Sequence, residues 1–133
     1  MIKLYIGGKG SGKTKTLIDL VNKAATESNG SVVCIEKGDK LKLDVTYKAR
    51  LIDTDTYSIH NGEALFGFIA GILSSNNDIT DLFVDSALKI CGNDTDAFAA
   101  LLNKLEPLSA QINVVMTASI AADECPDNIK AYA

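Results

Sequence analysis

The sequence predicts an α/β fold of three layers, in which helices cover both faces of a mainly parallel sheet of about five strands. Short apolar runs of strand length alternate with longer segments whose apolar residues recur at helical spacing. The run at 31–36 is apolar on both faces, as a strand in a parallel sheet must be. Because 47% of the 133 residues are apolar, we expect a single domain, residues 1–133, with a proper core.

The first half of the chain contains three of the expected strands and one helix. Residues 2–6 form a short apolar run, which predicts the first strand. Residues 13–28 predict the first helix, which Asn29 and Gly30 would end. A buried strand is expected over 31–36 and a short strand over 49–52, the latter at an edge of the sheet.

The middle of the chain continues this alternation. Asn61 is expected to cap a helix over 62–73, whose apolar residues lie on one side. A polar turn follows, and then residues 79–85 predict a third strong strand.

The last part of the chain contains one more helix and one more strand. Asp94 or Thr95 is expected to cap a helix that runs through Glu106, and residues 112–117 predict a fourth strong strand. The tail, 118–133, has no pattern that assigns it. Right-handed crossovers between the parallel strands would bring the strand ends together along one edge of the sheet.

A glycine-rich loop lies between the first strand and the first helix. Residues 7–14, GGKGSGKT, match G-x-x-x-x-G-K-[ST] at every fixed position. Such a loop lets backbone N–H groups turn inward and bind an anion, with the positive end of a helix behind them. Lys13 would add a charge at the β- and γ-phosphates, and the Thr14 hydroxyl would bind Mg²⁺. The residues expected to bind the nucleotide are Gly7, Gly8, Lys9, Gly10, Ser11, Gly12, Lys13, Thr14 and Lys15.

This loop resembles the Walker A loop of the P-loop nucleoside triphosphatases. The resemblance implies a parallel sheet with ATP and Mg²⁺ bound at the carboxyl ends of its strands. The apolar run 82–84 with Asp85 after it resembles the Walker B strand of the same family. It implies that Asp85 holds Mg²⁺ together with Thr14. Asp81 is a second candidate, but it lies at the other end of the predicted strand.

A hydrolase of this family also needs a group that orients or deprotonates the attacking water. One large branch has a glutamate directly after the Walker B acid, where this chain has Ser86. In the RecA-like and the twitching-motility or secretion ATPases, the acid ends the strand after the first helix. Here Glu36 takes that place. GKGSGKTKTL and SVVCIEKGDKL resemble the corresponding segments of the secretion ATPases over roughly the first 40 residues, which implies Lys13 and Glu36 as catalytic residues.

Five further polar residues are weaker candidates. Thr117 and Ser119 follow the fourth strong strand, where the additional-strand branch of the family has a residue that senses the γ-phosphate. Asp53 and Asp55 follow the short strand and would either face the same edge or belong to a polar loop. His60, the only histidine, is expected to be a loop residue, although the secretion ATPases have a histidine-bearing box.

Some classes of function are excluded by what the sequence lacks. Arg50 is the only arginine, whereas P-loop kinases use several to neutralise phosphoryl oxygens, and this argues against a phosphotransferase. A nucleoside kinase resembling the thymidine kinases shares the opening strand and loop, but no zinc-type cysteines support it. Residues 103–106, NKLE, do not match the guanine-reading N-K-x-D and lie in a predicted helix.

Charge and cysteine content predict a cytoplasmic protein that does not bind nucleic acid. The net charge of −4 repels nucleic acid and anionic membranes, and no apolar run of about 18 residues predicts a membrane span. The cysteines, Cys34, Cys91 and Cys125, are odd in number and have no C-x-x-C spacing, which favours reduced thiols. The lysines at 37, 40, 42 and 48 are expected to be a solvated face.

The sequence therefore predicts first a minimal RecA-like ATPase that binds ATP·Mg²⁺. The alternative is a nucleotide-sensing or regulatory module that does not hydrolyse its ligand. It could instead be a subunit whose companion, a protein partner or a second copy of the chain, supplies the missing catalytic groups. A nucleoside kinase is the third interpretation.

Overall fold

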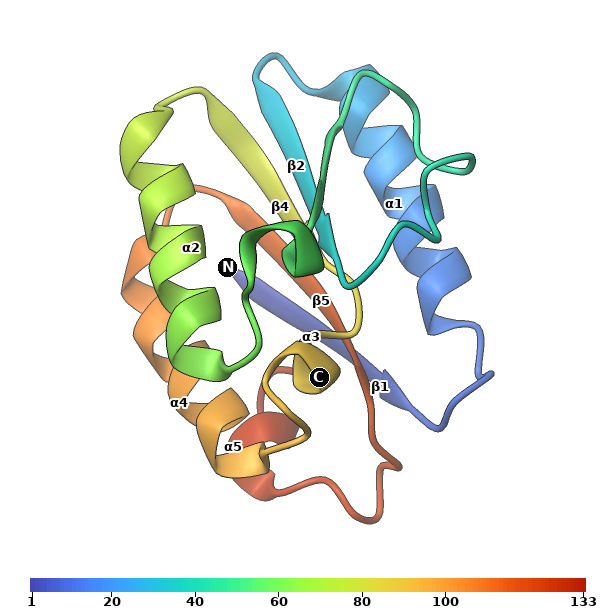
Figure 1. The fold of residues 1–133 in the computed structure, drawn as a ribbon, viewed down its shortest axis with the longest axis vertical. Helices are drawn as coiled ribbons and strands as arrows, with labels where there is room; N and C mark the ends of the chain where they lie inside the picture. Colours follow the sequence, from blue (N-terminus) through green and yellow to red (C-terminus); the bar gives the residue numbers. More distant parts are fainter.

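The computed structural model describes residues 1–133 and contains one sheet of five strands, all of them parallel to their neighbours. The order across the sheet is β1-β5-β4-β2-β3 (Figure 1). The expected α/β fold is confirmed. The strands are β1 (Ile2–Gly7), β2 (Ser31–Glu36), β3 (Arg50–Asp53), β4 (Ile79–Val84) and β5 (Asn113–Ser119).

Helices cover both faces of this sheet, with α1 on one side and α2 and α4 on the other (Figure 1). No helix has both the length and the apolar character needed to cross a membrane. The α-helices are α1 (Lys13–Glu27), α2 (Gly62–Ser75), α3 (Ala87–Ile90), α4 (Thr95–Leu105) and α5 (Asp127–Lys130), and the 3₁₀ helices are η1 (Thr54–Tyr57) and η2 (Glu106–Ser109).

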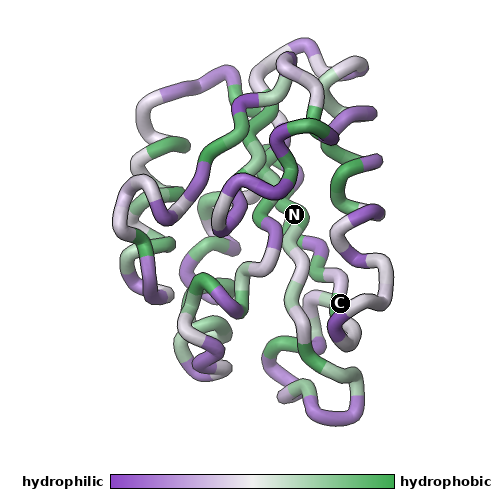
Figure 2. The backbone as a smooth tube through the Cα atoms, turned by 45° about the vertical axis from the view of Figure 1, so that its right-hand side comes forward, coloured by the Kyte–Doolittle hydropathy of each residue, from purple (hydrophilic) through white to green (hydrophobic).

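Alternation along β2 divides the apolar residues between two cores. Val32 and Cys34 pack with α1 and with the segment that follows β2, whereas Val33 and Ile35 pack with α2 and α4. Successive side chains of a strand point to opposite faces, so a strand buried on both faces must be apolar throughout. Figure 2 shows the consequence, with hydrophobic stretches along the strands and hydrophilic stretches in the connecting loops.

Most expected elements are confirmed, with shifts of a residue or two at their ends. The Asn61 side chain caps α2 by accepting a hydrogen bond of 2.8 Å from the Ala64 amide. Asp94, not Thr95, caps α4, because its carboxylate accepts from two amides of the first turn. The strand expected over 79–85 ends one residue earlier, since Ser86 takes a left-handed conformation that turns the chain into α3.

The sequence did not predict two helices of four residues each, α3 and α5. A single helical turn is too short to show a repeating apolar pattern. The helix expected to end at Glu106 ends at Leu105, and Glu106 begins η2. The edge position expected for the short strand is confirmed, because β3 pairs only with β2.

Parallel pairing brings the carboxyl ends of the strands to one edge of the sheet, here called the carboxyl edge. In register, Gly7 lies beside Ser119 and Glu36 lies beside Asp53. The strand β5 separates β1 from β4. The glycine-rich loop and Asp85 therefore lie at the same edge with one strand between them.

The close approach of Gly30 to β4 provides a test of this packing. A Cβ at Gly30 would lie 2.1 Å from the Asp78 carbonyl oxygen, which already accepts a bond from the Ser31 amide. We expect Gly30→Ala to lower the free energy of unfolding by about 2 kcal/mol in urea titrations, because the backbone must shift. The matched control is Gly71→Ala in α2, where no atom lies within 4 Å and alanine should stabilise the helix by about 0.5–1 kcal/mol. A Gly30→Ala protein as stable as the wild type would contradict this packing.

Candidate functional site

The glycine-rich loop leaves β1 at Gly7 and enters α1 at Lys13. Gly10 and Gly12 have φ angles of 83° and 89°, in the left-handed region that residues with a Cβ rarely adopt. Gly12 is the N-cap residue of α1, and the Ser11 amide donates a hydrogen bond of 3.2 Å to the Gly8 carbonyl oxygen. The loop is thus a tight turn that ends on the amino end of a 15-residue helix, the geometry in which backbone amides can hold an anion.

Lys13 folds back over this loop. Its ammonium group donates hydrogen bonds of 2.9 Å to the Gly8 carbonyl oxygen and 3.4 Å to the Ser11 hydroxyl. A Cβ at Gly7 would lie 2.6 Å from that hydroxyl, so the Ser11 side chain would have to move if any other residue stood there. The lysine charge is therefore held at the mouth of the turn.

Asp85 follows β4 and is only 8% exposed. Its Oδ1 accepts hydrogen bonds from the Thr14 hydroxyl at 3.1 Å and from the Thr117 hydroxyl at 2.7 Å. The Ser86 amide donates to the Thr117 hydroxyl at 2.8 Å. The fold thus brings Thr14 and Asp85 into contact although 71 residues separate them in the sequence.

The two candidates at the end of β5 have different environments. The Thr117 hydroxyl is buried and its hydrogen bonds join Asp85 to the Ser86 amide. Ser119 is exposed and lines the cavity described below. Thr117 therefore positions Asp85. Of these two hydroxyl groups, only that of Ser119 is free to contact a ligand.

Glu36 ends β2 and is 2% exposed. Its two carboxylate oxygens accept from the Leu41 amide at 3.2 and 3.3 Å. Burial raises the pKa of this carboxyl, and the nearby Asp53 and Asp85 raise it further, although backbone hydrogen bonds from Leu41 and Lys40 oppose the change. Glu36 thus holds the turn that follows β2 while it lines the same cavity as Thr14 and Asp85.

A cavity of about 320 Å³ lies beside the loop at the carboxyl edge. Six of the residues expected from the motif line it: Lys9, Gly10, Gly12, Lys13, Thr14 and Lys15. Gly7, Gly8 and Ser11 do not line it, and the latter two accept the hydrogen bonds of Lys13 instead. The other lining residues are Glu36, Lys37, Lys40, Leu41, Asp85, Ser86, Lys89, Asn93 and Ser119.

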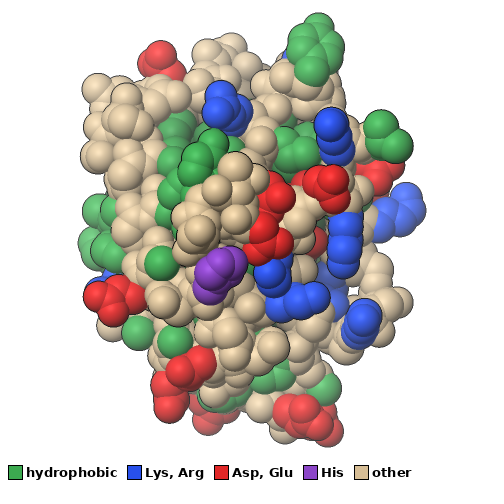
Figure 3. All heavy atoms as spheres, in the orientation of Figure 1, with side chains coloured by type: hydrophobic (Ala, Val, Ile, Leu, Met, Phe, Trp, Pro, Cys, Tyr) green, Lys and Arg blue, Asp and Glu red, His purple; other side chains and the backbone are tan.

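The lysine cluster after β2 was expected to be a solvated face, and Lys40, Lys42 and Lys48 are exposed while Lys37 is half-buried. Lys37 and Lys40 line the cavity, whereas Lys42 and Lys48 do not. Lys89, in α3, also lines it, and no motif in the sequence indicates this. On the face shown in Figure 3, basic side chains gather beside a group of acidic ones to the right of centre.

Asp53, Asp55 and His60 lie near the cavity but do not line it. The Asp53 carboxylate accepts from the Gly38 and Asp55 amides at 2.8 and 2.9 Å, so it holds two turns together. Asp55 pairs with Lys37 at 2.8 Å, and this hydrogen bond lowers its pKa. His60 is exposed, with Nδ1 4.0 Å from Asp55. Asp53 thus ends β3 at the carboxyl edge and Asp55 lies in η1, but their carboxylates bind neighbouring amides and Lys37 and do not face the cavity.

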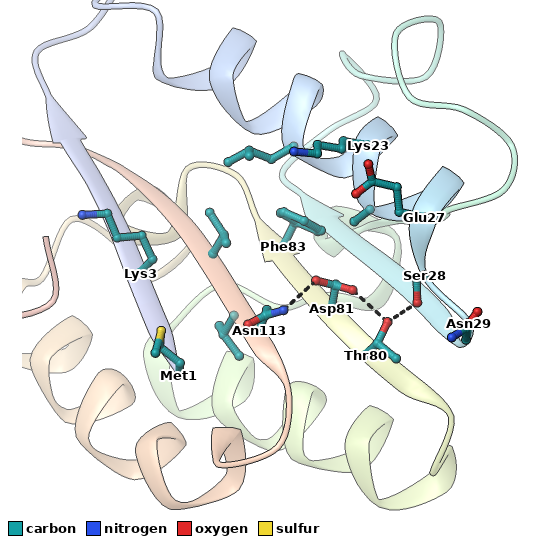
Figure 4. Close-up of a pocket in the computed structure, with 14 residues that line it drawn as sticks. Met1, Lys3, Lys23, Glu27, Ser28, Asn29, Thr80, Asp81, Phe83 and Asn113 are labelled. Carbon is teal, nitrogen blue, oxygen red and sulfur yellow. Dashed lines mark hydrogen bonds between the residues drawn. The ribbon is translucent and has the colours of Figure 1, made fainter.

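Asp81 lies at the opposite edge of the sheet, in a second cavity of about 550 Å³ between α1 and strands β1, β5 and β4 (Figure 4). Its carboxylate accepts hydrogen bonds from Thr80 at 2.7 Å and from Asn113 at 3.2 Å, and Thr80 contacts Ser28. In parallel α/β sheets, ligands bind at the carboxyl ends of the strands. Asp81 is therefore a structural residue and not part of the loop site.

Metal binding at the loop site would need ligands beyond the protein. No group of three or more His, Cys, Asp or Glu side chains is arranged to hold a metal ion. Thr14 and Asp85 supply a hydroxyl and a carboxylate oxygen, which are hard ligands suited to Mg²⁺. Mg²⁺ is commonly held by one or two such groups together with phosphate oxygens and water. The donor set fits a metal that arrives with a phosphorylated ligand.

The comparisons with known proteins assign no family to this chain. No family model matches it, and no curated protein matches it. What this site does must therefore be inferred from the residues themselves.

The buried carboxyl of Glu36 leads to a prediction about stability and pH. Because folding raises its pKa, the folded state favours the protonated form. Glu36 therefore does not reduce the free energy of unfolding at low pH, and it reduces it increasingly as the pH rises through the raised pKa. We expect Glu36→Gln to raise the thermal midpoint at about pH 8 and to change it little at about pH 4. A variant that is less stable than the wild type at the higher pH would contradict this reading of the carboxyl.

Proposed function

We propose that this chain is a RecA-like P-loop protein that binds ATP·Mg²⁺ at the carboxyl edge and hydrolyses the ATP. The observation that carries the proposal is the hydrogen bond of 3.1 Å between Thr14 and Asp85, directly beside the glycine-rich loop. The motif alone can occur in any flexible turn. A hydroxyl at the start of α1 in contact with a buried acid after β4, two places from β1 in the sheet, is an arrangement that can hold a phosphate-bound metal.

The loop residues have distinct roles in this proposal. The amides between Gly7 and Thr14 hold the phosphates, and the charge of Lys13 turns from the Gly8 carbonyl to the phosphate oxygens. Thr14 and Asp85 would hold Mg²⁺, which neutralises charge on the phosphates as they react. Thr117 keeps Asp85 oriented.

Glu36 is the proposed group that orients the attacking water. It lines the same cavity as Thr14 and Asp85, and its raised pKa brings it closer to the range in which a carboxylate acts as a base. Asp53 and Asp55 have their carboxylates occupied elsewhere. Glu36 is therefore the acid best suited to the role.

A nucleotide-sensing module that does not hydrolyse its ligand is the second candidate. Arg50 is the first residue of β3, so the only arginine lies at the opposite edge from the loop. Both oxygens of Glu36 also accept from the Leu41 amide, which restrains the carboxylate. A partner or a second copy would then have to supply the charge that stabilises the transition state. A phosphate-release assay separates the two candidates, because only the first gives turnover. If the first is correct, Glu36→Gln should abolish that turnover.

Lys13→Ala tests the proposed site directly. At about 100 times its dissociation constant, ATP·Mg²⁺ should stabilise the wild type by about 2.7 kcal/mol and raise its thermal midpoint by several degrees. We expect this shift to disappear in Lys13→Ala, because the phosphates lose their nearest charge. Lys23→Ala is the matched control, since Lys23 is exposed on the same helix and lies outside the site, and it should keep the full shift. An undiminished shift in Lys13→Ala would remove the loop from the proposal.

A further inference from the structure

The cavity beside the loop is lined almost entirely by glycine, polar and charged residues. Of its 15 lining residues only one, Leu41, is hydrophobic, and Leu41 is itself 3% exposed. None of the four tyrosines or four phenylalanines of the chain lines it. Sites that recognise an aromatic ring are lined mostly by apolar and aromatic side chains. This cavity therefore has no surface on which a nucleotide base could stack.

The charges in the cavity match those of a triphosphate chain. Six lysines line it, of which Lys15 lies 4.0 Å from Asp19 and Lys37 lies 2.8 Å from Asp55. The other four lysines, at 9, 13, 40 and 89, have no carboxylate within 4.0 Å, and the carboxylates of Glu36 and Asp85 line the same cavity.

This leaves two positive charges in excess, and Mg²⁺ brings the excess to four. A triphosphate chain carries about four negative charges near neutral pH, because each inner phosphate contributes one and the terminal phosphate about two. The phosphates and the metal therefore balance the charge of the cavity, and because a nucleoside is uncharged this balance concerns the phosphate chain alone.

The cationic lining also comes from three separate segments. Lys9 belongs to the loop after β1, Lys40 to the turn after β2, and Lys89 to α3 after β4. These segments follow three different strands, so the lysines surround the cavity and do not form a single exposed stripe. Lysine is a compact point charge that suits any phosphate oxygen and imposes no planar geometry.

We infer that this site recognises the polyphosphate chain of its ligand and not the base, so that inorganic polyphosphate is itself a ligand. This inference rests on the proposed function, since it concerns the same loop and the same metal. It adds Lys40 and Lys89 to the phosphate-binding residues, and it means that the protein does not distinguish one base from another.

Titration calorimetry of the wild type with Mg²⁺ and tripolyphosphate, ATP, GTP or AMP tests the inference. We expect the dissociation constants for tripolyphosphate, ATP and GTP to agree within about threefold, and AMP to bind far more weakly because it lacks the chain. If ATP binds more than about 30 times more tightly than tripolyphosphate, base recognition is present and the inference is overturned, although the proposed function stands. If neither ATP nor tripolyphosphate binds, the proposed function itself is overturned.

Two variants with a matched control assign the effect to the cavity. Lys40→Ala and Lys89→Ala should each weaken tripolyphosphate and ATP by the same factor, about tenfold, because each loses a charge-assisted contact. Lys42→Ala should leave both unchanged, since Lys42 is exposed in the same segment but does not line the cavity. Circular dichroism of each variant checks that it is folded. A folded Lys40→Ala and a folded Lys89→Ala that both bind tripolyphosphate like the wild type would overturn their assignment.

Tyr47 offers a competing explanation, which a further variant tests. It is 91% exposed and lines a separate cavity on the other side of Glu36. If a base stacked there, ATP would bind much more tightly than tripolyphosphate and Tyr47→Ala would abolish the difference. We expect Tyr47→Ala to leave the affinities for both ligands unchanged.

Discussion

The carboxylate of Asp85 joins three parts of the chain at the carboxyl edge of the sheet. It follows β4, accepts a hydrogen bond from Thr14 at the start of α1, and accepts a second from Thr117 in β5. A buried carboxylate is costly unless donors satisfy it, so the two threonines are needed for the edge to pack as it does. The same bonds fix the amino end of α1, and with it the glycine-rich loop, beside the acid. This one carboxylate therefore holds the start of α1, the end of β4 and β5 together at the proposed site.

The side chains around that contact define what chemistry the edge can perform. Lysines surround the cavity, and the only arginine lies at the far edge of the sheet. Amides, lysines and a metal can bind a polyphosphate and stabilise charge on it. The planar, two-pronged grip on phosphoryl oxygens that arginine provides in kinases is not available within one chain. This set of residues supports the proposal of triphosphate binding, with slow hydrolysis or with catalysis completed by a partner.

The sequence predicted the parallel sheet well because its strands are short, apolar and separated by clear stops. The strand over 31–36 was predicted with its observed bounds, since a strand buried on both faces must be apolar throughout. The helix α3 was not predicted, because one turn shows no period. The sequence also could not predict which lysines line the cavity. Lys40 and Lys42 look alike in sequence, and their difference depends on the turn that the buried Glu36 holds through the Leu41 amide.

We propose above all that the loop before α1 holds phosphates next to the Thr14–Asp85 contact. A crystal structure with Mg²⁺ and a non-hydrolysable ATP analogue tests it most directly. We expect the phosphates on the amides between Gly7 and Thr14, and the metal bound by Thr14 and Asp85. An analogue bound elsewhere on the molecule, or an empty loop at saturating ligand, would contradict it.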